Sequence, residues 1–159
     1  MPEMHRAAIA LGSNLPSRLG GPRENLDEAV ERIGALGHVA AVSSYITSAP
    51  EMYLDQPDFV NAALLLSTSL SPLNLLGELL KIEERMGRVR TGVPSKGPRI
   101  IDLDLILFDD LAMESEALTL PHPGLADRRF VLAPLAEIAP DWQHPVTGLT
   151  VVEMLARLG

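Results

Sequence analysis

Hydrophobic and polar positions predict that the chain begins with a strand followed by a helix. Residues 7–11 form a short apolar run, which predicts a buried strand that ends at the Gly-Ser-Asn sequence of residues 12–14. A helix is predicted from Pro22, and either Gly34 or Gly37 marks its end. Its apolar positions recur at helical spacing: Leu26, Ala29, Val30, Ile33 and Leu36.

Two strands and a second helix are predicted in the middle of the chain. Residues 38–48 and 59–69 are rich in β-branched and apolar side chains, which favours a strand in each. The segment between them, residues 49–58, contains prolines and no helical pattern, so the two strands are expected to pair antiparallel. Ser71 is placed to cap a helix that starts at Pro72. One side of that helix is predicted to carry Leu73, Leu76, Leu80, Glu83 and Met86.

The last part of the chain is predicted to hold one more long strand and two short helices. Gly87 is placed to end the second helix, and residues 100–108 predict the strand. Residues 109–129 show an irregular pattern rich in acids and prolines. Short helices are predicted at residues 130–138 and 151–158.

The order of these elements is β-α-β-β-α-β followed by a C-terminal extension. This order predicts an α+β fold of the ferredoxin-like type, in which helices pack on one face of an antiparallel sheet. The sequence shows no internal repeat, low-complexity segment or linker, so residues 1–159 are expected to form a single domain.

Composition excludes several classes of protein. The net charge of -8 disfavours non-specific binding to nucleic acid, which needs a basic surface. The chain has no cysteine, which excludes disulfides and thiolate metal sites and fits a reducing compartment. No apolar run approaches the roughly 20 residues of a membrane span, and the N-terminus lacks a signal-peptide pattern. We therefore expect a cytoplasmic protein that binds neither nucleic acid nor membrane. A monomer is expected as well, although composition does not determine the oligomeric state.

A basic loop at residues 87–99 leads directly into paired carboxylates. It contains four cations and no acid: Arg88, Arg90, Lys96 and Arg99. Guanidinium and ammonium groups suit phosphate oxygens, and the glycines of the loop permit it to close over a ligand. A solvated surface loop is the alternative that its composition leaves open. Neither a Walker A motif nor a G-x-G-x-x-G motif is present.

Asp102 and Asp104 are predicted to share one face of the strand at residues 100–108. Alternation puts Ile106 and Phe108 on that face as well. The opposite face is predicted to carry Ile101, Leu103, Leu105 and Leu107. Two neighbouring acids repel each other and lose hydration on burial, and Mg²⁺ relieves both effects by binding their oxygens. The alternative is a solvent-facing strand end whose acids pair with arginines. Together with the basic loop, the pair favours a polyphosphate and divalent-metal site.

Several other polar residues each allow two interpretations. Asn61 lies in an apolar strand, and its amide either binds the edge of a heterocycle or satisfies a nearby loop. His122 lies between two prolines, so it either contacts a phosphate or carries a proton, or it simply occupies a turn. Glu83 near the end of the second helix is either a supporting acid or a surface acid. Arg128 and Arg129 form a second small basic group.

Six segments of the chain resemble the 6-hydroxymethyl-7,8-dihydropterin pyrophosphokinases, a family of folate-pathway enzymes. They are ALGSN at 10–14, VSSYITSAP at 42–50, DQPDFVNAA at 55–63, GRVR at 87–90, GPRIIDLDL at 97–105 and LPHPGLADRRFVLAPLAEIAP at 120–140. They occur in the family's order, and the combination of GPRxxDLDL with QPDFxN is the most specific part.

The resemblance implies a ferredoxin-like fold and a transfer reaction. The β,γ-pyrophosphate of ATP would pass to the pterin hydroxymethyl group, and AMP would be released. ATP would be the co-substrate, and Asp102 and Asp104 would hold two Mg²⁺ ions. Arg88, Arg90 and Arg99 would bind the phosphates or stabilise the transition state.

The resemblance also assigns residues to the two substrates. Asn61 would form a hydrogen bond to the pterin, and Phe130 would stack on the pterin ring. The full set of implied pterin contacts is Ser48, Ala49, Glu51, Asn61, Arg128 and Phe130. The implied ATP contacts are Arg88, Arg90, Lys96, Arg99, Leu105, Thr119 and His122.

Departures from the family concentrate in the basic loop. Ser95 stands where the family often has a basic residue, Lys96 stands where some members have tryptophan, and the loop is longer by one residue. Pro123 replaces an aromatic residue of some relatives. A non-catalytic module that binds ATP or polyphosphate on the same fold is therefore the alternative function. A structural or subunit-interface protein is a third hypothesis.

Overall fold

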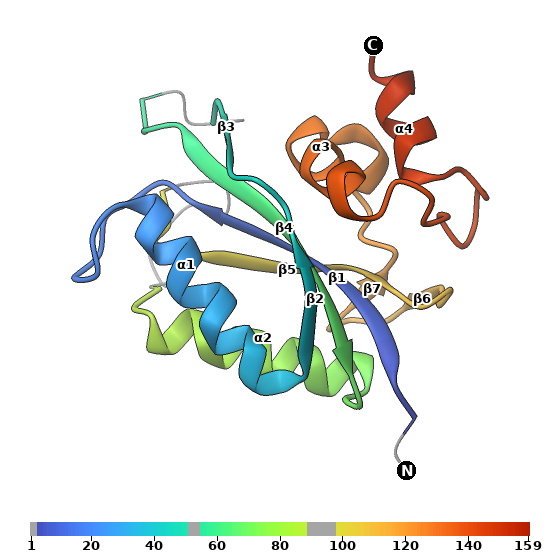
Figure 1. Ribbon diagram of the computed structural model, residues 1–159, viewed down its shortest axis with the longest axis horizontal. Coiled ribbons are helices and arrows are strands. Elements are labelled where there is room, and N and C mark those ends of the chain that lie inside the picture. Colours follow the sequence, from blue (N-terminus) through green and yellow to red (C-terminus); the bar gives the residue numbers. More distant parts are fainter. Residues whose placement is uncertain (1–2, 51–54, 89–97) are drawn as a thin grey trace.

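The computed structural model describes residues 3–50, 55–88 and 98–159, and a five-stranded antiparallel sheet forms its centre (Figure 1). The strands run in the order β2-β4-β1-β5, and β3 pairs with β4. Their bounds are β1 His5–Ser13, β2 His38–Val42, β3 Ile46–Ser48, β4 Phe59–Thr68 and β5 Asp102–Phe108. β1 is therefore central, and β5 forms one outer edge of the sheet.

Helices cover both faces of this sheet (Figure 1). On one face, α1 (Pro22–Ile33) and α2 (Pro72–Arg85) bury Leu26, Ile33, Leu75 and Leu79 against β1, β4 and β5. On the other face, α3 (Arg129–Ile138) and α4 (Val151–Arg157) pack on residues such as Leu65. Among the described residues there are also two 3₁₀ turns, at Gly34–Leu36 and Leu125–Asp127. None of the described helices is long and apolar enough to cross a membrane.

The sequence located these helices well but missed details of the strands. β1 continues through Gly12 and Ser13 instead of ending before them, and β5 begins at Asp102 instead of residue 100. The segment 109–129, expected to be irregular, contains a small hairpin of β6 (Met113–Glu114) and β7 (Thr119–Leu120). Such two-residue strands are too short to produce a recognisable periodic pattern.

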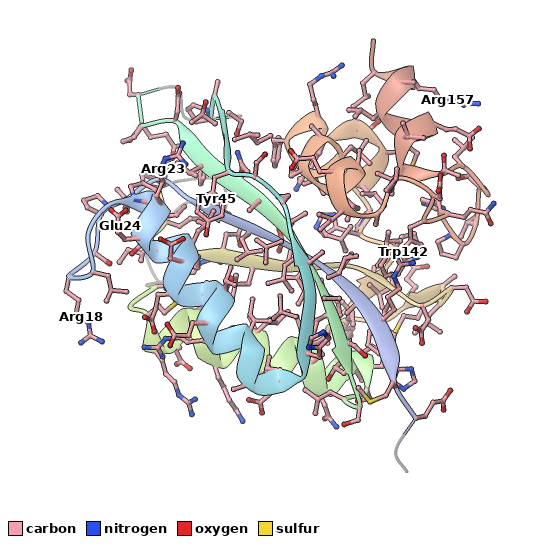
Figure 2. The ribbon with its side chains drawn as sticks, in the orientation of Figure 1. Arg18, Arg23, Glu24, Tyr45, Trp142 and Arg157 are labelled. Carbon is pink, nitrogen blue, oxygen red and sulfur yellow. The ribbon has the colours of Figure 1, made fainter. Side chains whose placement is uncertain are left out.

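The strand predicted at residues 38–48 is divided into β2 and β3 by three polar residues. The Ser43 hydroxyl accepts from the Ala63 amide at 2.8 Å, and Ser44 donates from its amide and its hydroxyl to Glu137 of α3. The Tyr45 hydroxyl donates to Asp27 of α1 at 2.6 Å, and Figure 2 shows Tyr45 near the start of α1. These side chains bind partners on both faces of the sheet, so regular alternation stops here.

Strict alternation along β5 fails after Leu105. The pairing of β5 with β1 shifts between Ala8 and Ile9, so that Ile106 is an extra residue in a bulge. Leu107 consequently packs on the face covered by α3, together with Ile106, and Phe108 packs on the opposite face. The prediction was wrong for these two side chains, whereas Asp102 and Asp104 lie before the bulge.

The buried side of α2 also differs from the predicted one. The side chains buried in the core are Leu75, Leu79, Ile82 and Met86, together with Glu83. Leu73 and Leu80 are 50% and 41% exposed. The error arose because the helix is leucine-rich on several sides, which blurs its apolar stripe.

Gly87 ends α2 as predicted. Its φ of 97° lies in the region that favours glycine, and its amide donates to the Glu84 carbonyl at 3.0 Å. The next amide, Arg88, donates to the Glu83 carbonyl at 3.0 Å, which completes a Schellman-type helix end. The turn thereby sets where the Arg88 side chain leaves the helix.

We expect Gly87→Ala to lower the free energy of unfolding by about 1–2 kcal/mol, because an L-residue is strained at this backbone angle. Gly77, inside the same helix, is the matched control, since an added Cβ meets nothing within 4 Å. Gly77→Ala should be neutral or stabilise by up to about 1 kcal/mol. Urea unfolding of both variants checks this, and equal effects would contradict the account of the turn.

Candidate active site

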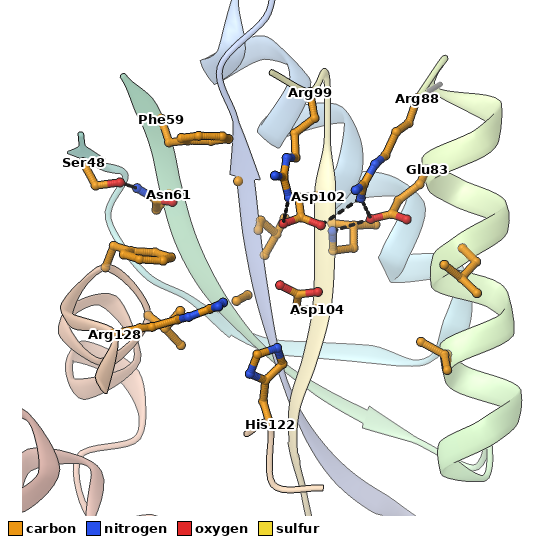
Figure 3. Close-up of a pocket in the computed structure, with 18 of the residues that line it drawn as sticks. Ser48, Phe59, Asn61, Glu83, Arg88, Arg99, Asp102, Asp104, His122 and Arg128 are labelled. Atoms are coloured by element: carbon orange, nitrogen blue, oxygen red, sulfur yellow. Dashed lines mark hydrogen bonds and ion pairs between the residues drawn. The ribbon is translucent and has the colours of Figure 1, made fainter. Parts of the chain in front are cut away.

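A cavity of about 380 Å³ lies over the sheet where β1, β4 and β5 meet α2 and the start of α3 (Figure 3). Gly12 of β1 pairs with Asn61 of β4 on one side and with Asp102 of β5 on the other. Because the sheet alternates, Ala10 and Gly12 lie between these polar side chains. A Cβ at position 12 would lie 3.5 Å from Asn61 Oδ1, so a large side chain there would fill the part of the cavity next to β1.

One end of the cavity holds a cluster of carboxylates and guanidinium groups. Arg88 Nη1 donates to Asp102 Oδ1 at 2.8 Å, and Arg99 Nη1 donates to Asp102 Oδ2 at 3.0 Å. The same nitrogen of Arg88 donates to Glu83 Oε2 at 2.8 Å. Burial lowers the pKa of Arg88, but the charges of Asp102 and Glu83 outweigh that effect and raise it. Arg88 is therefore always charged here.

Asp104 lies beside this cluster, between the carboxylates and His122 (Figure 3). Within the described residues, no donor forms a hydrogen bond or ion pair with its carboxylate. Burial, followed by the charges of Asp102 and Glu83, raises the pKa of Asp104 to about 7, while Arg128 and Arg88 oppose the shift. The cavity thus contains a carboxylate whose negative charge is poorly compensated.

The raised pKa of Asp104 makes its ionisation unfavourable for folding. The folded protein keeps a proton that the unfolded chain loses above its ordinary value of 3.8, so stability falls as pH rises toward about 7. We expect Asp104→Asn to remove this loss. As the pH is raised from 5 to 8, the unfolding free energy of the variant minus that of wild type should rise by roughly 1–4 kcal/mol.

Urea unfolding at the two pH values measures this gain. Asp110→Asn, at an exposed acid shortly after β5, is the matched control and should show no such gain. A gain that is the same in both variants, or absent from Asp104→Asn, would contradict the electrostatic account of Asp104.

The other end of the cavity is aromatic, with one oriented amide. Phe59 and Phe130 both line it, and Asn61 Nδ2 donates to Ser48 Oγ at 2.8 Å. The guanidinium of Arg99 lies 5.5 Å from the Phe59 ring, and that of Arg128 lies 5.8 Å from the Phe130 ring. Flat apolar surfaces beside an amide suit a planar heterocycle.

His122 enters the cavity from the turn after β7. Its amide donates to the Ile106 carbonyl at 2.9 Å, and its Nδ1 accepts from the Gly124 amide at 3.1 Å. Burial and the charge of Arg128 lower the pKa of His122, with Asp102 acting in the opposite direction. The neutral ring therefore carries its proton on Nε2.

A buried amide pair anchors the backbone that leads into β5. Asn14 and Arg99 form two hydrogen bonds. The backbone amide of Asn14 donates to the Arg99 carbonyl at 3.1 Å, and Asn14 Oδ1 accepts from the backbone amide of Arg99 at 2.9 Å. Asn14 Nδ2 also donates to Gln56 Oε1 at 2.8 Å. These bonds fix the backbone of Arg99 while its side chain reaches Asp102.

Residues 8–140 match the sequence profile of the 7,8-dihydro-6-hydroxymethylpterin-pyrophosphokinase (HPPK) family. The chain belongs to the HPPK family. It is 44% identical to a 2-amino-4-hydroxy-6-hydroxymethyldihydropteridine pyrophosphokinase of Haemophilus influenzae, over 89% of this chain and 86% of the relative. It is 39% identical to the Synechocystis enzyme of the same name, over 98% of this chain and 77% of the relative.

Some relatives are much longer than this chain. The chain is 40% identical to the folic acid synthesis protein fol1 of Schizosaccharomyces pombe, but it spans only 20% of that protein. The fold resembles a Plasmodium falciparum HPPK-DHPS crystal structure with a TM-score of 0.74 and 16% identity, over 98% of this chain and 43% of the other. At that identity the likeness concerns the fold alone.

The structure brings together ten of the residues that the HPPK resemblance implies. These cavity-lining residues are Ser48, Ala49, Asn61, Arg88, Arg99, Asp102, Asp104, His122, Arg128 and Phe130. Leu105 instead lies in the core under α1 and α2, and Thr119 lies on β7 outside the described lining. Glu51, Arg90 and Lys96 lie outside the described residues. Arg129 is exposed, so the small basic group contributes only Arg128 to the cavity.

Sequence reasoning did not assign three side chains of the cavity wall, Phe59, Leu76 and Leu80, and it left two interpretations open for a fourth, Glu83. Phe59 lies two positions before Asn61 on the same strand, so alternation alone would have placed both side chains on one face. Leu76 and Leu80 were expected on the packed side of α2, but they line the cavity. Glu83 is not a surface acid, since it is 1% exposed.

Proposed function

We propose that the chain transfers pyrophosphate from ATP to the hydroxymethyl group of 6-hydroxymethyl-7,8-dihydropterin, yielding the pterin diphosphate and AMP in folate biosynthesis. The observation that carries this proposal is the joint presence of a family match over residues 8–140 and one cavity that holds the family's acids, arginines and aromatic residues. The two ends of the cavity suit the two substrates.

The proposal includes the finer architecture. The strand order β2-β4-β1-β5, with α1 and α2 as the crossover helices, supports a ferredoxin-like βαββαβ fold, and α3 and α4 support a C-terminal extension. Residues 1–159 would act as a single pyrophosphokinase domain. Because one chain supplies the whole described lining, we propose a monomer, and the absence of cysteine supports a cytoplasmic location.

Asp102 and Asp104 fit a divalent cation in their chemistry. The Asp104 carboxylate has no described donor, and burial together with the charges of Asp102 and Glu83 raises its pKa. A bound cation would offset these effects. The described residues contain no group of three or more His, Asp or Glu side chains able to hold a metal by themselves. Two Mg²⁺ ions would therefore complete their shells with water and phosphate oxygens, as Mg²⁺ commonly does. When bound, they would neutralise the charge that builds on the transferred phosphates.

The arginines would orient the polyphosphate for transfer. Arg88 and Arg99 present guanidinium groups from opposite sides of Asp102, and by resemblance Arg90 and Lys96 would add charge. The hydroxyl oxygen would form a bond to the β-phosphorus while the bond from that phosphorus to the α,β-bridging oxygen breaks. AMP leaves with the bridging oxygen, and the hydroxyl proton is released to solvent water. Holding the two reactants in line supplies much of the rate enhancement.

The aromatic end would hold the pterin. Phe130 would stack on its ring, with Phe59 offering a second flat surface, and Asn61 would bond to its edge. Ser48 orients the Asn61 amide by its hydrogen bond, while Ala49, Glu51 and Arg128 would complete the pterin contacts. His122 would meet a phosphate through Nε2–H. By resemblance alone, Leu105 and Thr119 would contact the nucleotide, although the Leu105 side chain lies in the core and Thr119 lies outside the described lining.

Nucleotide analysis tests this proposal. The protein is incubated with ATP, Mg²⁺ and the hydroxymethyl dihydropterin, and the nucleotides are separated by chromatography. We expect AMP to appear only when the pterin is present. Accumulation of ADP would indicate single phosphoryl transfer instead, and tight binding of ATP without turnover would indicate a non-catalytic nucleotide-binding module.

A further inference from the structure

Glu83 is an acid to which the proposed reaction gives no role, although it lies at the centre of the site. It is 1% exposed, and among the described residues no other ionisable side chain is as fully buried. A buried carboxylate loses hydration, so it is retained only where donors and positive charge compensate.

One oxygen of Glu83 joins two separate parts of the site. Oε2 accepts from the Leu103 amide at 2.7 Å and from Arg88 Nη1 at 2.8 Å. Leu103 lies between Asp102 and Asp104 on β5, an outer strand of the sheet that the described residues form. Glu83 therefore serves this amide as a neighbouring strand would, and it pins the backbone segment that carries both aspartates (Figure 3).

Arg88 is bound to Glu83 in two ways. Its backbone amide donates to the Glu83 carbonyl in the turn after α2, and its guanidinium donates to the Glu83 side chain. Both oxygens of Asp102 face guanidinium groups, from Arg88 and Arg99. A cation at Asp102 would compete with these contacts for the same carboxylate oxygens, which favours exchange of one arginine for the cation. The Glu83 contacts do not involve Asp102, so they can keep Arg88 in place during that exchange.

We propose that Glu83 is a positioning residue for pyrophosphoryl transfer, holding Arg88 beside the Asp102–Asp104 segment while Asp102 exchanges an arginine for the metal–polyphosphate. The inference rests on the proposed function. Its effect acts on the phosphate end of the cavity, so it should change nucleotide binding and kcat without changing the KM for the pterin.

Steady-state kinetics of three variants test the role of Glu83. Glu83→Ala should lower kcat by about 10- to 100-fold and leave the pterin KM unchanged. Glu83→Gln should recover part of this loss, because an amide oxygen can accept both hydrogen bonds but lacks the charge that anchors Arg88. Glu84→Gln, on the exposed side of the same helical turn, should behave as wild type. Wild-type kcat in Glu83→Ala, or a loss confined to the pterin KM, would overturn the inference.

A double-mutant cycle provides a readout that does not depend on turnover. Calorimetry measures binding of α,β-methylene-ATP with Mg²⁺ to wild type, Glu83→Ala, Arg88→Ala and the double variant. We expect the double variant to bind no more weakly than Arg88→Ala alone, because Glu83 acts through Arg88. Additive losses would overturn the inference.

The two experiments separate the inference from the function on which it rests. If wild type binds the nucleotide but releases no AMP, the proposed function fails and the cycle still decides the role of Glu83. If AMP is released and the cycle is additive, only the inference fails. If Glu83→Ala does not fold, as judged by circular dichroism, Glu83→Gln carries both experiments, and wild-type values for it in both would overturn the inference.

Discussion

Asp102→Asn is expected to reduce AMP formation by about a thousandfold or more, because the metal contribution to phosphoryl chemistry is worth several kcal/mol. Asparagine keeps the size of the side chain and one oxygen, which can still accept from Arg88 or Arg99. The substitution removes the negatively charged carboxylate that would bind Mg²⁺. Asp104→Asn should have a similar effect on activity. Initial rates at saturating ATP, Mg²⁺ and pterin measure the loss.

The control for this experiment is an acid outside the site. Asp110→Asn removes one negative charge from an exposed position near the end of β5, and we expect it to retain wild-type rates. Thermal unfolding should show that Asp102→Asn remains folded. Wild-type activity in folded Asp102→Asn would remove the basis for assigning the metal to this residue.

Arg99→Ala is expected to lower kcat by about 10²- to 10³-fold, the loss typical of removing one preorganised donor to a developing charge. Its guanidinium lies between Asp102 Oδ2 and the Phe59 ring, at the junction of the two ends of the cavity. Arg99→Lys should recover little, because lysine keeps the charge but not the planar fork. Rates are compared with affinities for α,β-methylene-ATP.

Arg85→Ala is the matched control, since Arg85 is exposed on the last turn of α2. It should leave both the rate and the affinity unchanged. If Arg99→Ala weakens nucleotide binding as much as it lowers kcat/KM, then Arg99 contributes to ground-state binding rather than to the transition state.

The charged and polar residues of the site were easier to predict from the sequence than the apolar side chains that line the cavity. Asp102, Asp104 and the nearby arginines could be predicted because their charges contrast with an apolar strand and an acidic chain. Asn61 was also recognisable, because an amide in an apolar strand is unusual. In each case the signal is local, so one sequence is enough to detect it.

Features that depend on packing between elements were harder to predict. The burial of Glu83 follows from the approach of α2 to β5, and nothing in the helix pattern distinguishes it from its exposed neighbour Glu84. The bulge at Ile106 depends on the register between β1 and β5, so alternation along β5 gave the wrong faces for Leu107 and Phe108. The small hairpin β6–β7 is too short to have a periodic pattern of its own.

³¹P NMR of the complete reaction tests the central claim most directly. ATP, Mg²⁺ and the hydroxymethyl dihydropterin are mixed with the protein, and a parallel sample contains a pterin with a methyl group in place of the hydroxymethyl group. The account predicts that the ATP resonances are replaced by those of AMP and of a diphosphate ester carrying both the β- and γ-phosphorus, and that the parallel sample does not change. A monophosphate ester with ADP, or AMP accompanied by free pyrophosphate in both samples, would contradict it.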